Sequence, residues 1–249
     1  MIVFVTGASS GFGVAIARRF ARGGHRLVLA ARRVERMQAL LPELAVPAHV
    51  IELDVRDGAA VAAAIAALPA EFAAIDLLVN NAGLALGMEP AHRASLDDWE
   101  RMVDTNIKGL MYVTRAVLPG MVERNRGHVV NIGSTAGEWP YPGGNVYGAS
   151  KAFVRQLSLN LRADLLGTAV RVTDIEPGMA GGTEFSQVRF HGEEARAAKV
   201  YENVEPLTAE DIADTVHWVA TLPARVNVNT ISMMPVSQAF GPLAVHRGR

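Results

Sequence analysis

Short apolar runs alternate with amphipathic segments along the whole chain, and this alternation constrains the fold more than any other feature. The segments between the runs repeat apolar residues at intervals of three and four, which is typical of helices that pack on one face. Seven runs are apolar enough to be strands buried on both faces: residues 2–5, 26–30, 49–53, 75–79, 128–132, 169–175 and 227–233. Alternating strands and helices predict a Rossmann-type, doubly wound α/β fold with a seven-stranded parallel sheet and helices on both faces.

The 249 residues suffice for one domain of this type, and no linker or charge run divides them. We therefore expect a single domain over residues 1–249. Within it, a glycine-rich cofactor half is expected at about 1–90, a catalytic and substrate half at about 91–235, and a C-terminal tail at 236–249.

Composition excludes several classes of partner and chemistry. The formal net charge is −1 and the charges are evenly spread, which argues against a nucleic acid partner. The absence of cysteine removes disulfides, thiolate catalysis and cysteine-based zinc sites. The apolar N-terminal run ends at Thr6, too early for a signal peptide, and Pro69 and Asp76 interrupt the apolar stretch 61–79. We therefore expect a cytoplasmic protein without a membrane partner.

A glycine-rich turn follows the first predicted strand and leads into a helix expected from about Val14. Ligands of doubly wound sheets bind beyond the carboxyl ends of the strands, so this turn lies where a cofactor is expected. Glycine lets the backbone approach a pyrophosphate, and the helix N-terminus attracts its charge. The turn is composed of Gly7, Ala8, Ser9, Ser10, Gly11, Phe12 and Gly13. Its spacing differs from the G-x-G-x-x-G fingerprint, and a plain strand-to-helix connection is the alternative interpretation.

The residues that follow the second and third strands favour NADP over NAD. Sites for NAD usually place an Asp or Glu after the second strand to bind the ribose 2′-hydroxyl, whereas this chain has Arg32 and Arg33. Guanidinium groups suit a 2′-phosphate, although both residues are also compatible with the start of a solvated helix. Asp54 and Val55, after the third strand, are positioned for the adenine ring, with a helix N-cap as the alternative for Asp54.

Four polar residues form the predicted catalytic constellation. Tyr147 and Lys151 are four apart within the predicted helix 145–166, so both project from one helix face. A neighbouring ammonium lowers the pKa of a phenol from about 10 and makes it a usable acid or base. Ser134, after the fifth strand, is placed to hold the reacting oxygen. Asn106, inside a helix after the fourth strand, is expected to hold a water that links Lys151 to solvent.

Each catalytic candidate also has a purely structural interpretation. A tyrosine and a lysine four apart occur by chance in helices, a serine at a strand end is often a cap, and an asparagine within a helix commonly faces solvent. Their joint occurrence, in order and directed at one crevice, favours catalysis. No metal is required by this chemistry.

These residues together resemble the short-chain dehydrogenase/reductase family over essentially the whole chain. Further matches are Asn80-Asn81-Ala82-Gly83 after the fourth strand and Pro177-Gly178 after the sixth. Within the family, residues 80–92, 131–151 and 174–185 closely resemble the NADP-dependent 3-hydroxy acid dehydrogenases. That resemblance implies oxidation of L-allo-threonine and serine, and reduction of malonic semialdehyde to 3-hydroxypropionate.

The resemblance also implies how the residues act. A proton passes between the substrate hydroxyl and Tyr147 while hydride moves between the substrate carbon and the nicotinamide. Lys151 also holds the nicotinamide ribose, and residues 81–83, namely Asn81, Ala82 and Gly83, pack beside that half of the cofactor. A flap that closes over the cofactor comprises Pro177, Gly178, Met179, Ala180, Gly181, Gly182, Thr183, Glu184 and Phe185. Gly181 and Gly182 suit a hinge in this flap.

A hydroxy acid or semialdehyde substrate brings a carboxylate that needs a cationic or N–H partner. The candidates are Arg189, in the flap, and His246 and Arg247, in the tail, with a solvated surface or a subunit contact as the alternative for each. Three residues after Ser134 are predicted to line the substrate pocket, Glu138, Trp139 and Tyr141, with core packing as the alternative for Trp139.

The family further implies a homotetramer in which long helices near 99–121 and 145–166 pair between subunits and carry exposed apolar residues. The last residues, 235–249, are expected to reach a neighbouring subunit. Two other functions remain open. One is a carbonyl reductase of the same family that acts on a bulkier ketone, and the other is a non-catalytic NADPH-binding sensor.

Overall fold

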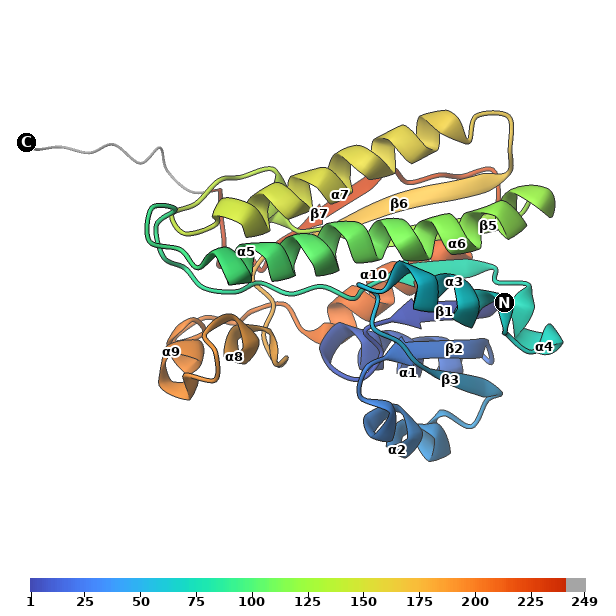
Figure 1. Cartoon of the computed structure of the whole chain (residues 1–249), viewed down its shortest axis with the longest axis horizontal. Helices are drawn as coiled ribbons and strands as arrows, with labels where there is room; N and C mark the ends of the chain where they lie inside the picture. The colour runs from blue at the N-terminus through green and yellow to red at the C-terminus, as the bar shows by residue number, and fades with distance from the viewer. Residues whose placement is uncertain (241–249) are drawn as a thin grey trace, which may run out of the picture.

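The computed structural model describes residues 1–240, so the predicted roles of His246 and Arg247 lie outside the described residues, as does most of the predicted tail. Within residues 1–240, seven parallel strands form one sheet in the order β3-β2-β1-β4-β5-β6-β7 (Figure 1). The strands are β1 (Ile2–Thr6), β2 (Arg26–Ala31), β3 (Ala48–Glu52), β4 (Leu77–Asn80), β5 (Gly127–Ile132), β6 (Val170–Pro177) and β7 (Thr230–Met233). The predicted fold class is confirmed.

Helices cover both faces of the sheet. One face carries α1 (Gly11–Arg22), α2 (Val34–Leu44) and α10 (Ala209–Thr221). The other carries α3 (Gly58–Ala66), α4 (Ala70–Ala73), α6 (Leu110–Glu123) and α7 (Asn145–Asp164), with α5 (Leu96–Val103) and the π-helical turn η1 (Asp104–Gly109) leading into α6. A short 3-10 turn, η2 (Thr135–Gly137), follows β5, and α8 (Phe185–Arg189) and α9 (Glu194–Lys199) stand together beside the end of the sheet (Figure 1).

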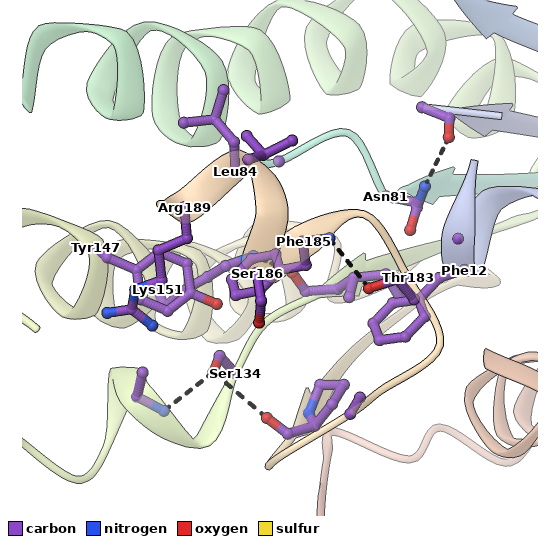
Figure 2. Close-up of a pocket in the computed structure, with 18 of the residues that line it drawn as sticks. Phe12, Asn81, Leu84, Ser134, Tyr147, Lys151, Thr183, Phe185, Ser186 and Arg189 are labelled. Atoms are coloured by element: carbon purple, nitrogen blue, oxygen red, sulfur yellow. Dashed lines mark hydrogen bonds between the residues drawn. The ribbon is translucent and has the colours of Figure 1, made fainter. Parts of the chain in front are cut away.

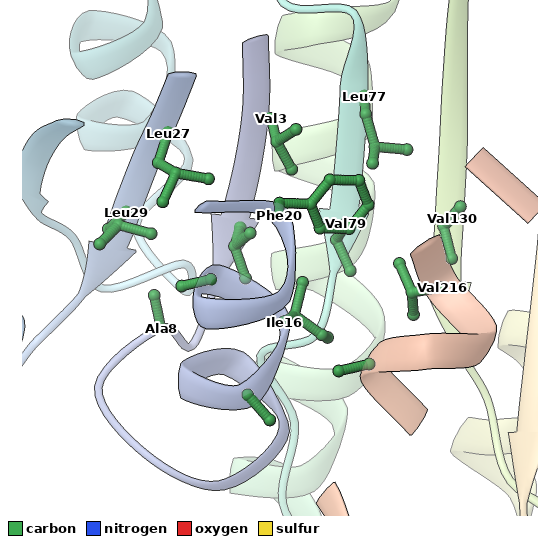
Figure 3. Packing of buried hydrophobic residues seen from close by; sticks show 14 of the residues in the cluster. Val3, Ala8, Ile16, Phe20, Leu27, Leu29, Leu77, Val79, Val130 and Val216 are labelled. Atoms are coloured by element: carbon green, nitrogen blue, oxygen red, sulfur yellow. The ribbon is translucent and has the colours of Figure 1, made fainter. Parts of the chain in front are cut away.

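The core between α1 and the sheet shows how the apolar residues of the helices pack on the strands. Ile16 and Phe20 are four apart, point to one face of α1 and are fully buried against strand residues such as Val3 and Leu77 (Figure 3). Burial of one such side chain stabilises the fold by about 1.5–3 kcal/mol. The apolar strand runs therefore hold the helices that present the site.

Several boundaries differ from the predicted ones, each for a local reason. The fourth strand begins at Leu77 rather than at residue 75, because the Asp76 carboxylate accepts a hydrogen bond from the Ile2 N–H at 2.9 Å and anchors a turn. The seventh strand begins at Thr230 rather than at 227, because the Asn227 side chain hydrogen-bonds the backbone of β6 at 2.8 and 2.9 Å. At the start of the seventh strand, a side chain thus replaces backbone pairing.

Two helices also depart from expectation. The helix after the first strand begins at Gly11, within the glycine turn, rather than near Val14. The predicted long helix at 99–121 consists of α5, the π-helical η1 and α6, so its middle is wider than an α-helix. None of the helices in residues 1–240 combines the length and apolarity that crossing a bilayer requires.

The strand order changes direction between β1 and β4, and this point creates the crevice in which the predicted site residues meet. The loops after β1 and β4 diverge there to opposite faces of the sheet. The exposed apolar residues predicted on the long helices are present, as Met111 and Val122 on α6 and Leu159 on α7. The homotetramer itself stays a prediction.

Candidate active site

A cavity of about 770 Å³ lies at the carboxyl ends of the strands, within the size range of small-molecule and cofactor sites. Of the predicted site residues, those that line it are Gly7, Ser9, Ser10, Gly11, Phe12, Arg32, Arg33, Asp54, Val55, Asn81, Ala82, Gly83, Ser134, Trp139, Tyr141, Tyr147, Lys151, Pro177, Gly178, Met179, Ala180, Thr183, Glu184, Phe185 and Arg189. The cavity therefore brings together segments from both halves of the chain.

Some predicted residues lie behind the cavity wall instead. Ala8 is fully buried in the core, and Gly13 is a glycine because a Cβ there would collide with the Gly7 carbonyl as α1 leaves the turn. Gly181 and Gly182 do not line the cavity. Gly182 has a φ of 69°, a backbone conformation that favours glycine. The hinge role of the two residues stays a prediction.

The prediction that Glu138 lines the substrate pocket is wrong. Its carboxylate lies 3.4 Å from the Arg155 guanidinium on α7, and the residue is not part of the cavity wall. The other two predicted residues, Trp139 and Tyr141, do line the cavity, as does Pro140 between them. Trp139 is partly exposed and its ring lies 4.5 Å from that of Phe240, so it is not a core residue.

Thr6 fixes the glycine turn to the end of β4. Its hydroxyl accepts hydrogen bonds at 3.0 Å from the N–H groups of Asn81 and Ala82, and the Asn81 amide donates to the Thr6 carbonyl at 2.9 Å. This role of Thr6 was not predicted, although a hydroxyl residue at the end of a buried strand is a signal for it. The two loops that border the crevice are thereby held at a fixed spacing.

Arg33 is held at the side of the cavity where β2 ends. Its Nε and a terminal nitrogen donate to the hydroxyls of Ser9 and Ser10 at 3.3 and 2.9 Å. Another terminal nitrogen lies 2.8 Å from the carboxylate of Glu184, which also binds Arg36 at 2.6 Å. These cations hold the pKa of Glu184 below its usual value, through the hydrogen bond from Arg36 first. The flap is thus joined to the end of β2 by charge.

Asp54 also lines the cavity, but its carboxylate is already paired. Both of its oxygens accept hydrogen bonds from the Arg56 Nε, at 2.9 and 3.0 Å, and this pairing lowers the pKa of Asp54. Part of the acceptor capacity predicted for an adenine amino group is therefore in use. Val55 packs against Gly109 of η1, where a larger side chain has no room.

Ser134, Tyr147 and Lys151 gather in the pocket, with Arg189 beside Tyr147 (Figure 2). The Ser134 hydroxyl is near enough to the Tyr147 phenol to lower its pKa; it donates to the Pro177 carbonyl at 3.4 Å and accepts a hydrogen bond from the Ala136 N–H at 3.1 Å. The Lys151 ammonium donates to the Ile132 carbonyl at 2.7 Å and lies 5.9 Å from the centre of the Tyr147 ring. Ser134, Tyr147 and Lys151 therefore line one cavity, and their catalytic roles stay a prediction.

The predicted effect of Lys151 on Tyr147 is wrong for the groups of this chain. Burial raises the pKa of Tyr147 to about 12, and the groups that lower it are Ser134, through its hydrogen bond, and Arg189, through its charge. Burial also lowers the pKa of Lys151 to about 8. Desolvation therefore exceeds the attraction that spacing alone suggested, and the phenol keeps its proton at neutral pH.

Asn106 is buried in η1 and clamps two segments of the site. Its amide nitrogen donates to the Leu84 carbonyl at 2.8 Å and to the Ser150 hydroxyl at 3.0 Å, and its oxygen accepts from the Leu84 N–H at 2.9 Å. The predicted water-holding role does not fit this amide nitrogen, because both of its hydrogens are used by the protein. Ser150 was not predicted as a site residue, and its position directly before Lys151 is the only sequence signal for it.

Arg189, at the end of α8, is half-buried beside Tyr147. It donates to the Tyr141 hydroxyl at 2.7 Å and to the Gly87 carbonyl at 3.3 Å. Its guanidinium carbon lies 5.4 Å from the centre of the Tyr141 ring and 5.6 Å from that of Tyr147. Arg189 is the one predicted partner of the substrate carboxylate that falls within residues 1–240, and it lines the cavity.

Comparison with known proteins identifies the family. A model of the short chain dehydrogenases matches residues 1–194. The chain belongs to this family. It is 66% identical over 247 residues to the NADP-dependent 3-hydroxy acid dehydrogenase YdfG of Salmonella typhi, covering 99% of this chain and 100% of that protein. It is 54% identical over 249 residues to sulfoacetaldehyde reductase 2 of Chromohalobacter salexigens, covering 99% and 98%.

A solved structure is similarly close. The closed form of a serine dehydrogenase complexed with NADP⁺ superposes with a TM-score of 0.98 and 64% identity, covering 100% of each chain. The predicted resemblance to the short-chain dehydrogenase/reductase family is therefore confirmed.

Proposed function

We propose that this chain is an NADP-dependent oxidoreductase that transfers hydride between the nicotinamide and small 3-hydroxy acids, with Tyr147 as the residue that moves the proton. The observation that carries the proposal is the guanidinium of Arg189, 5.6 Å from the centre of the Tyr147 ring. A phenol beside a serine hydroxyl predicts proton transfer at an alcohol or carbonyl oxygen, and a cation next to it predicts an anionic substrate. L-allo-threonine, serine, 3-hydroxypropionate and malonic semialdehyde meet both requirements.

The residues of the cavity fit NADP. The end of β2 carries Arg32 and Arg33 and no carboxylate, and Arg33 is directed to the glycine turn by its bonds to Ser9 and Ser10. Bound NADP supplies the nicotinamide carbon that accepts hydride from an alcohol or returns it to a carbonyl group. The names of the relatives in Salmonella and of the serine dehydrogenase complex support the same choice of cofactor.

The proton transfer follows from the positions of three side chains. Ser134 donates a hydrogen bond to the substrate oxygen and keeps it beside Tyr147. In oxidation, the Tyr147 oxygen accepts the hydroxyl proton as hydride leaves the neighbouring carbon; in reduction, Tyr147 returns a proton to the forming alkoxide. Lys151, fixed by the Ile132 carbonyl, presents its ammonium beside Gly83 on the cofactor side of the site.

Arg189 binds the substrate carboxylate in this proposal. A guanidinium has five N–H donors, and the two bonds to Gly87 and Tyr141 leave others for a carboxylate. The relatives' names support an anionic substrate class, since both a 3-hydroxy acid and sulfoacetaldehyde carry an acid group close to a hydroxyl or carbonyl carbon.

The test compares an acid with its neutral analogue. Arg189→Met should lower kcat/KM for 3-hydroxypropionate by about 10- to 150-fold, the equivalent of one or two charge-assisted hydrogen bonds of about 1.5–3 kcal/mol in total. It should leave kcat/KM for 1-propanol nearly unchanged. Arg189→Lys should retain part of the preference for the acid, because it keeps the charge but not the planar fork.

Arg196→Met is the matched control, because Arg196 is an exposed arginine on α9 that pairs with surface glutamates. Equal losses for the acid and the alcohol in the Arg189→Met enzyme would refute the carboxylate role. Turnover of a bulky ketone with none of L-allo-threonine, L-serine, 3-hydroxypropionate or sulfoacetaldehyde would refute the substrate class and favour the bulkier-ketone alternative.

A further inference from the structure

Two buried carboxyl groups, which the proposed reaction does not use, lie behind Lys151. Asp174 and Glu176 are two residues apart on β6, so both project from the face of the sheet that α7 covers. They are 0% and 1% exposed. Within residues 1–240, no hydrogen-bond donor is found for any of their four carboxyl oxygens. Two fully charged carboxylates without donors are too costly to bury side by side, so the pair needs another explanation.

Asp174 lies against the segment that anchors the catalytic lysine. A Cβ at Gly133 would collide with the Asp174 carboxyl group, whose Cγ lies 3.0 Å from that position. Gly133 directly follows Ile132, whose carbonyl accepts the hydrogen bond from the Lys151 ammonium. A glycine at this point therefore admits a carboxyl group next to the attachment point of Lys151.

Glu176 faces a different cation. The Arg155 Nε is 3.4 Å from the Glu176 carboxylate, and Arg155 is one helical turn beyond Lys151 on α7. The other charged group here is Glu138, which pairs with Arg155 from the loop after η2. The neighbouring β7 (Thr230–Met233) contributes no titratable side chain.

We propose that Asp174 and Glu176 share one proton and form a buried carboxyl pair that keeps the Lys151 ammonium charged in the working enzyme. Asp174 is then a positioning residue that acts through Lys151: loss of the shared proton places a negative charge beside the segment that anchors Lys151, while Glu176 is held by Arg155. The inference rests on the proposed function, since it gives Asp174 a part in the reaction of Tyr147 and Lys151.

The electrostatics of the pair agree with this arrangement. Burial and the charge of Glu176 raise the pKa of Asp174 to about 7, and the charge of Lys151 opposes that rise. Burial lowers the pKa of Lys151 to about 8, and the charge of Asp174 is what opposes that fall. As the pH rises through about 7, Asp174 gains its charge just before Lys151 would begin to lose its own. The pair thus extends the pH range in which Lys151 stays charged.

The protonation of Lys151 can be measured without turnover, because the chain has only three lysines, Lys108, Lys151 and Lys199. In protein labelled with ¹³C-lysine, the ε-carbon signals are titrated by NMR. Asp174→Asn should move the Lys151 midpoint down by about one pH unit or more, as removal of a charge a few ångströms away requires. Glu176→Gln should leave the midpoint in place, because the Asp174 carboxylate remains. Lys108, exposed and paired with Asp104, is the internal reference.

A pH profile supplies the functional readout. The alkaline fall of kcat for 3-hydroxypropionate should occur at lower pH in Asp174→Asn and at an unchanged pH in Glu176→Gln. If the asparagine variant does not fold, Asp174→Ala removes the same charge. A Lys151 midpoint that does not move in the Asp174 variant, or that moves equally in both variants, would overturn the proposal. Failure of the unchanged protein to oxidise any hydroxy acid would defeat the proposed function, while the NMR titration would still decide on the pair.

Discussion

Replacing Arg33 by glutamine should lower the preference for NADP over NAD. Two of its nitrogens bind the hydroxyls of Ser9 and Ser10 in the glycine turn, so the charge is fixed where the ribose of a bound dinucleotide is expected. A charge-assisted hydrogen bond contributes about 1.5–3 kcal/mol. The Arg33 side chain is 39% exposed, so solvent screens its charge and the contribution falls in the lower half of that range. The expected result is a rise of about 10- to 30-fold in the Kd of NADPH, with the Kd of NADH little changed.

Replacement of Glu184 should have the opposite effect on the preference for NADPH. Its carboxylate lies 2.8 Å from Arg33 and 2.6 Å from Arg36, so it competes with a 2′-phosphate for both cations. Glu184→Gln should therefore strengthen NADPH binding relative to NADH. The loss of the link between the flap and β2 should affect both cofactors alike, so the ratio of the two Kd values isolates the electrostatic effect.

The assay is a fluorescence titration of each variant with NADPH and with NADH. Arg18→Gln is the control, because Arg18 is also an arginine paired with a glutamate, Glu43, but lies on α1 outside the cavity wall. Equal weakening of both cofactors by Arg33→Gln would refute the 2′-phosphate role of Arg33. A lower NADPH-to-NADH preference in Glu184→Gln would refute the competition.

Three further predictions concern catalysis and assembly. Because burial raises the pKa of Tyr147 to about 12, the phenol is protonated at neutral pH, so the oxidation rate should rise with pH between about pH 6 and pH 8 while the reduction rate stays nearly flat. Tyr147→Phe should remove about 10²- to 10⁴-fold of kcat with NADPH binding retained, and unchanged turnover would favour a mechanism without this phenol or a sensor role. Leu159→Glu should shift the expected tetramer toward smaller species in sedimentation, because it places a charge on an exposed apolar position of α7, whereas Gln156→Glu on the same helix should not. A single species of unchanged mass in both variants would exclude this face as an interface.

The fold could be predicted because short, local patterns in the sequence determine it. Runs that are apolar at every position have no stable alternative to burial on both faces, and the glycine turn marks the first crossover. The start of β7 could not be predicted, because the side chain of Asn227 replaces backbone pairing there and nothing in the local pattern indicates which strand it contacts. The π-helical turn around Asn106 depends in the same way on partners in other elements, Leu84 and Ser150.

The presence of Ser134, Tyr147 and Lys151 in one cavity could be predicted, but their electrostatics could not. The spacing of Tyr147 and Lys151 indicates a shared helix face, yet it contains no information on how deeply that face is buried. Burial decides the pKa of both groups here. Glu138 was misplaced for a similar reason, since its partner Arg155 becomes a neighbour only when η2 packs on α7.

Arg189 connects substrate binding to proton transfer. Its charge is one of the two influences that lower the pKa of Tyr147, so a carboxylate that binds Arg189 cancels part of that influence and makes the phenol hold its proton more strongly. In the proposed reaction, the guanidinium, 5.6 Å from the centre of the Tyr147 ring, binds the carboxylate of a substrate whose hydroxyl lies at the phenol. In a 3-hydroxy acid, a single carbon separates the carboxylate from the carbon that bears the hydroxyl, so both ends reach their partners at once. A ketone on a long chain has no group that binds Arg189 while its carbonyl lies against Ser134, and the spacing of these residues therefore favours short acids.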